Sequence, residues 1–100
     1  MGDRAMAEIK TEHGSLYFYT HWTGNTLPAT ADDALELARP RWDDEPYALK
    51  IVVDYLIREA GARDSETGAG LLLRPYAEDE YNHDEPSVII DLVNHKVATR

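Results

Sequence analysis

The sequence predicts an α+β domain, in which an antiparallel sheet of four to five strands carries two helices on one face. Short runs rich in β-branched and aromatic residues lie at both ends of the chain, near residues 8–21 and 71–97. Two stretches with helical start and stop signals lie between them, giving the order β-β-α-α-β-β. One hundred residues suffice for one hydrophobic core. We therefore expect residues 8–98 to form a single domain after a frayed end at residues 1–7.

The strongest helical signal runs from Asp43 to Gly61. Asp44 is a candidate N-cap, Pro46 suits the first turn, and Gly61 stands where a C′ glycine would end a helix, so we predict a helix over 45–60. Its polar stripe consists of residues spaced to form i,i+4 pairs, Lys50, Asp54 and Arg58.

The rest of this helix is apolar over more than half of its circumference, and we expect Val53 and Leu56 in the core. A helix of this kind must be covered on two sides, by the sheet and by a second helix or a second copy of the chain. A homodimer that buries part of this helix or an edge strand is therefore expected.

The strands and the shorter helix follow from local patterns. Two runs, Glu8–Thr11 and Ser15–His21, flank Gly14 and predict a hairpin. A short helix is predicted from Ala31 to Arg39, capped by Thr30 and ended by Pro40. After a loop, strands are predicted at Leu71–Tyr76 and Ser87–Leu92, separated by an acidic loop at 77–86, and a turn at 93–97 leads into a last short strand.

The charge is the informative part of the composition. The chain contains nineteen acidic and ten basic side chains, for a formal net charge of −9. Nucleic acids and anionic membranes bind proteins through Lys and Arg and repel an acidic protein. Direct binding of this chain to either is therefore not expected. The chain contains no cysteine, and its longest apolar runs are three residues, too short to span a bilayer. We expect a soluble, cytoplasmic protein.

An acidic surface of this kind suits a basic protein partner, although solubility alone also explains an acidic excess. The segment 77–86 contains five acids and no base, and other acids stand in pairs on the short helix and before the long one. The candidate partner-binding residues are Glu78, Asp79, Glu80, Asp84, Glu85, Asp32, Asp33, Asp43 and Asp44. Asp91 extends the same acidic stretch along the sequence.

Aromatic residues gather in and after the second strand. Such a cluster is most often core, but Tyr17, Tyr19 and Trp22 also form a candidate contact surface, because Tyr and Trp are favoured at interfaces. No residues are assigned to catalysis, to a cofactor or to a metal. The carboxylates are adjacent rather than spaced for a site, and no phosphate loop, nucleophile elbow or cysteine nucleophile is present. A small metal-binding or hydrolytic enzyme centred on His21 is the alternative.

Several short motifs carry a resemblance. They are Tyr19–Trp22, Leu27-Pro28, Arg41–Asp44 followed by Tyr47, Thr67-Gly68 and Pro86–Asp91. Together they resemble a family of small proteins found in bacterial and phage genomes, over roughly residues 8 to 92. The resemblance brings no activity, but it implies a mobile-element setting. Anti-CRISPR proteins are similar in size and charge, not in motif.

Two noncatalytic functions follow as hypotheses. In the first, a phage-encoded or prophage-encoded inhibitor uses its acidic surface, as a DNA mimic, to block a nucleic-acid-binding host complex such as a CRISPR effector. In the second, the protein is a structural or assembly component of a phage that acts through dimerisation.

Overall fold

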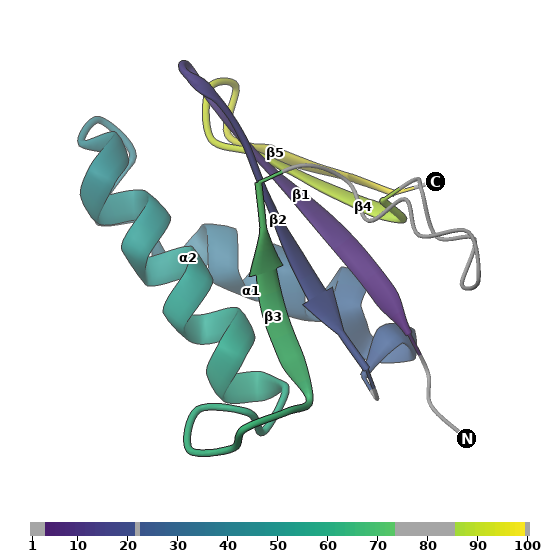
Figure 1. The fold of residues 1–100 in the computed structure, drawn as a ribbon. Helices are drawn as coiled ribbons and strands as arrows, with labels where there is room; N and C mark the ends of the chain where they lie inside the picture. Colours follow the sequence, from purple (N-terminus) through teal and green to yellow (C-terminus); the bar gives the residue numbers. More distant parts are fainter. Residues whose placement is uncertain (1–3, 22, 74–85, 100) are drawn as a thin grey trace.

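The fold is a five-stranded mixed sheet with two helices packed on one face. A computed structural model describes residues 4–21, 23–73 and 86–99. The strands have the order β3-β2-β1-β4-β5 across the sheet, so β1 is the central strand (Figure 1). The elements follow the chain as β1 Ala5–Thr11, β2 Gly14–Thr20, η1 Gly24–Thr26, α1 Leu27–Leu37, η2 Arg39–Arg41, α2 Glu45–Glu59, β3 Ala69–Leu72, β4 Val88–Asp91 and β5 Lys96–Thr99. The predicted α+β class is confirmed.

The first two strands form the predicted hairpin. Ala7 lies opposite Phe18 and Ile9 opposite Leu16, and Gly14 has a φ of 133°, which the turn requires and which side chains rarely adopt. The hydroxyl of Thr11 donates to the carbonyl oxygen of Gly14 across the turn, at 2.6 Å. β1 begins at Ala5, within the stretch expected to be frayed, because Ala7 pairs with β4 as well as β2 and is fully buried.

One pair of strands is parallel, where the sequence predicted an antiparallel sheet. β4 lies beside β1 in parallel register, with Ala7 opposite Val88 and Ile9 opposite Ile90. All other neighbours are antiparallel. Parallel neighbours need a long crossover connection rather than a tight turn, and β2, both helices and β3 lie between β1 and β4 in the chain. The central strand β1 therefore has one neighbour, β2, from the start of the chain and one, β4, from its last third.

α1 begins earlier than predicted. It starts at Leu27 rather than Ala31, with Thr26 at the N-cap position and Pro28 in the first turn. Backbone N–H groups in the first turn have no partner within the helix, so the N–H that proline lacks costs no helical hydrogen bond there. The earlier start places Leu27 in the core. The helix ends at Leu37, before Pro40, which lies in η2. Its inner residues are alanines at 31, 34 and 38, all fully buried, and α1 therefore packs closely on β1, β4 and β5.

α2 matches the predicted helix within a residue. Asp44 holds the N-cap position, but its side chain makes no capping hydrogen bond. Gly61 has a φ of 70°, and the amide of Ala62 donates to the carbonyl oxygen of Ile57 at 3.2 Å, which closes the last turn as predicted. At the other end, the amide of Glu12 donates to Oε2 of Glu45 at 3.0 Å, so the β1–β2 turn is joined to the start of α2.

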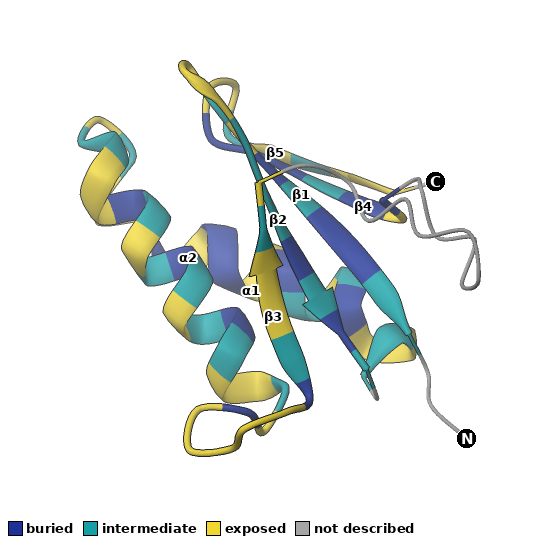
Figure 2. Ribbon diagram, viewed as in Figure 1, coloured by how far each residue is buried: buried dark blue, intermediate teal, exposed yellow. Residues whose placement is uncertain are grey.

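The core lies between the sheet and the helices. Ala7, Ile9, Phe18, Val88 and Ile90 line one face of the sheet and contact the buried residues of both helices. Figure 2 shows the buried positions of α1 and α2 turned inward and their exposed positions turned outward. Leu56 is buried as expected, whereas Val53 is only half-buried, because the inner face of α2 is centred on Ala48, Val52 and Leu56.

Candidate partner-binding surface

The structure tests only part of the predicted acidic surface. Glu78, Asp79, Glu80, Asp84 and Glu85 lie outside the described residues. On α1, Asp32 and Asp33 are exposed, as is Asp43 in the elbow between the helices, whereas Asp44 is half-buried. The backbone of Asp44 is also used structurally, because its carbonyl oxygen accepts the amides of Tyr47 and Ala48 at 3.0 Å each.

A hollow of about 470 Å³ lies on the outer side of the helices and contains one of the predicted acids. We call it the acidic groove. Its lining combines apolar and aromatic side chains with charged ones. It is lined by Asp33, Glu36, Leu37, Arg39, Pro40 and Tyr55. Leu37 is 51% exposed, so apolar surface is open to a partner here.

Acids from both helices act on Tyr55 in this groove. Partial burial raises the pKa of the Tyr55 hydroxyl, and the negative charges of Glu59 on α2 and Asp33 on α1 raise it further, against the opposing charge of Arg58. Negative charges from both helices therefore act on one hydroxyl at this hollow.

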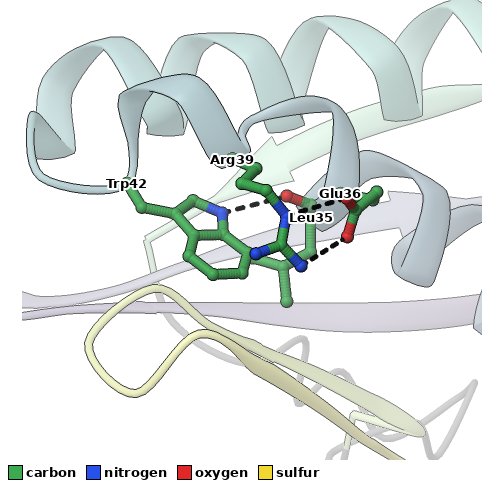
Figure 3. Close-up of polar contacts among 4 residues, drawn as sticks. All are labelled: Leu35, Glu36, Arg39 and Trp42. Atoms are coloured by element: carbon green, nitrogen blue, oxygen red, sulfur yellow. Dashed lines mark hydrogen bonds and ion pairs between the residues drawn. The ribbon is translucent and has the colours of Figure 1, made fainter.

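The cation in the lining of the groove is neutralised locally. Arg39 donates from Nε to Oε2 of Glu36 at 2.8 Å and from Nη2 to Oε1 at 2.9 Å, and its guanidinium lies 4.3 Å from the ring centroid of Trp42 (Figure 3). The hydrogen bond from Arg39 lowers the pKa of Glu36. Arg39 and Glu36 therefore compensate each other's charge, and Asp33 is the unpaired acid in the lining.

A second hollow adjoins the first at Leu37 and has a different charge. It measures about 440 Å³ and is lined by Leu37, Lys50, Ile51, Asp54 and Arg58. The predicted i,i+4 pairs among these polar residues are not formed. Asp54 instead accepts two hydrogen bonds from Nη2 of Arg63, at 2.8 and 3.0 Å, while Lys50 and Arg58 lie over the rings of Tyr47 and Tyr55. This hollow therefore carries two cations and one paired acid.

The predicted aromatic surface lies on the sheet face away from the helices. Tyr17 and Tyr19 alternate with the core residue Phe18, and both are half-buried. The hydroxyl of Tyr19 and Nδ1 of His21 are 2.7 Å apart, within hydrogen-bond distance. Trp22 lies outside the described residues. The two tyrosines therefore remain candidates for contact, with less exposed area than a free surface would give.

Candidate metal ligands do not gather at one place in the described part of the chain. No group of three His, Asp or Glu side chains there is arranged to hold a metal ion. His21, the centre of the alternative enzyme hypothesis, directly follows β2 and lies within hydrogen-bond distance of Tyr19. Among the same residues, no helix is long and apolar enough to cross a membrane.

Of the residues that line the groove, only Asp33 was in the predicted set; Glu36 and Tyr55 were missed, as was Glu59, whose charge raises the pKa of Tyr55. The i,i+3 spacing of Asp33 and Glu36 on α1 could have linked those two, but nothing in the sequence shows that Tyr55 and Glu59 of α2 lie beside them. Asp91, by contrast, was predicted to extend the acidic stretch and is not part of an exposed surface. It is 5% exposed and accepts the amides of Val93 and Asn94, at 2.9 and 3.0 Å, so it holds a turn rather than extending an acidic surface.

Comparison with protein-family models, with curated proteins and with solved structures found no match to this chain.

Proposed function

We propose that this chain is a noncatalytic binding protein that docks, through the acidic groove, on a basic surface of a partner that normally holds nucleic acid. The observation that carries the proposal is that Asp33 of α1 and Tyr55 of α2 line one hollow, where the charges of Asp33 and Glu59 also raise the pKa of the Tyr55 hydroxyl. The proposed partner is a CRISPR effector or another host complex of that kind, in the mobile-element setting that the sequence resemblance implies. Blocking by charge mimicry is then the mode of inhibition.

The groove suits a lysine or arginine side chain. The carboxylate of Asp33 would face its charged head, while Leu37, Pro40 and Tyr55 would contact its aliphatic stem. Because these groups are exposed, binding should weaken as salt rises, with screening over a Debye length of ~8 Å at physiological ionic strength.

The experiment begins with a photo-crosslinking residue at Leu37, which identifies the partner that contacts the groove. Its affinity is then measured across a salt series for wild type and for the triple variant Asp33→Asn, Glu36→Gln and Glu59→Gln. Exposed pairs contribute ~0.2–1 kcal/mol each, so we expect roughly tenfold weaker binding and a shallower salt dependence.

A matched control removes the same charge elsewhere. Glu12, Asp64 and Glu66 are exposed and lie outside the groove, and their triple amide variant should bind like wild type. Equal losses from both triple variants would show a nonspecific charge effect, and unchanged affinity of the groove variant would refute the groove as the docking site. A separate variant with Glu78, Asp79, Glu80, Asp84 and Glu85 changed to amides tests the acidic segment.

A further inference from the structure

The two edges of the sheet differ in how they are protected. β5 begins with Lys96, and lysine on an edge strand opposes pairing with another strand. β3 forms the other edge in the described part of the chain, and residues 67–73 contain no charged side chain. Leu71 is 47% exposed and Leu73, just after the strand, is 85% exposed. Figure 2 shows the exposed positions of β3 at the rim of the sheet. Among the residues that the structure describes, this edge is open and apolar.

The backbone of β3 has a defined set of outward-pointing groups. The amide of His21 donates to the carbonyl oxygen of Gly68 at 2.9 Å, and the register continues with Thr20 opposite Ala69. In antiparallel strands, residues whose polar groups point to the partner alternate with residues whose groups point away. The N–H and C=O groups of Ala69 and Leu71 therefore point to the outer edge.

We propose that a second copy of the chain pairs with this edge, β3 against β3 in antiparallel register, across a twofold axis at Gly70. In this register Ala69 of each copy lies opposite Leu71 of the other, and four hydrogen bonds satisfy every outward-pointing group of Ala69 and Leu71. The side chain of Leu71 in each copy packs beside the partner's Ala69 on the helix-bearing face. The edge is thus self-complementary, as a twofold interface requires.

The central pair gives a direct test of the register. Gly70 would lie opposite Gly70 of the partner subunit in a pair without hydrogen bonds, where the two Cα atoms approach to about 4.5 Å. That distance permits a disulfide. A Cβ atom added at Gly70 meets no atom within 4 Å, and the chain contains no other cysteine. Gly70→Cys should therefore cross-link into a covalent dimer under mild oxidation, whereas Ala98→Cys on the exposed opposite edge should not.

Light scattering on the full chain at high micromolar concentration supplies the second measurement. Wild type should have twice the mass of one chain, and Leu71→Lys should be monomeric with an unchanged circular dichroism spectrum. Ala98→Lys, the same charge on the other edge, should stay dimeric. A monomeric wild type, a dimer that survives Leu71→Lys, or cross-linking of Ala98→Cys as fast as Gly70→Cys would each overturn the proposal. The groove variants above do not touch β3, so this proposal and the proposed function fail independently.

Discussion

The indole of Trp42 and the imidazole of His95 stack almost in parallel, with ring centroids 4.4 Å apart and 4° between the planes. Trp42 belongs to the elbow between α1 and α2, and His95 to the turn before β5. The indole N–H also donates to the carbonyl oxygen of Leu35 at 3.0 Å (Figure 3). One side chain thus joins the elbow, the end of α1 and the last hairpin.

Trp42→Ala should destabilise the fold by about 3 kcal/mol, the low end for a buried aromatic residue because Trp42 is only half-buried. His95 has a φ of 59°, and asparagine tolerates that conformation while lacking the ring. A double-mutant cycle of Trp42→Ala and His95→Asn, followed by urea unfolding, should give a coupling free energy of ~0.5–1.5 kcal/mol. Additive effects would mean that the stack contributes nothing.

Leu56→Ala should cost ~2–5 kcal/mol, because Leu56 is 1% exposed and its truncation leaves a cavity between α2 and the core. Val53→Ala should cost less, since Val53 is half-buried. Leu37→Ala is the control, and we expect a change within about 0.5 kcal/mol at this exposed position. Denaturant unfolding curves for the three variants measure their losses in free energy of unfolding. A Leu56→Ala variant as stable as wild type would refute the assigned inner face of α2.

Asp91 should make the protein acid-sensitive. Burial raises the pKa of its carboxyl, but hydrogen bonds from Asn94 and Val93, with the charge of Lys10, outweigh it and lower the pKa overall. A lowered folded-state pKa gives stability that is complete above the unfolded value of ~3.9 and is lost as pH falls through the folded value.

Asp91→Asn should therefore be less stable than wild type at pH 7 by ~1–3 kcal/mol, with the difference narrowing below about pH 4. Thermal unfolding measured from neutral to acid pH gives the stability difference at pH 7 and its decrease at low pH. Asp32→Asn, on the exposed side of α1, is the control. A difference that does not change with pH would place the effect in packing rather than in charge.

The Tyr55 hydroxyl should report the field in the acidic groove. Its pKa is raised by partial burial and by Glu59 and Asp33, so Asp33→Asn combined with Glu59→Gln should lower that pKa while leaving the part due to burial. Carbon NMR of the tyrosine rings across alkaline pH, assigned with Tyr55→Phe, measures the shift. The matched double variant Asp64→Asn and Glu66→Gln should leave Tyr55 unchanged. If both double variants shift it equally, the two helices do not focus their charge here.

Local signals in the sequence determined the elements that depend on near neighbours. The hairpin at Gly14 and the end of α2 at Gly61 follow from turn and cap chemistry within a few residues, and both were predicted. The start of α1 was not, because burial of Leu27 against the sheet decides it.

Tertiary structure alone decided the parallel pairing of β1 with β4, the position of Asp33 and Tyr55 in one hollow, and the role of Asp91 in a turn rather than on the acidic surface. Each depends on which segments far apart in the chain share one core. Hydrophobic patterning marks which face of an element is buried, but not which other element covers it. The sequence shows how many acidic residues the chain contains. Which of them act on the same place between two helices depends on how the helices pack.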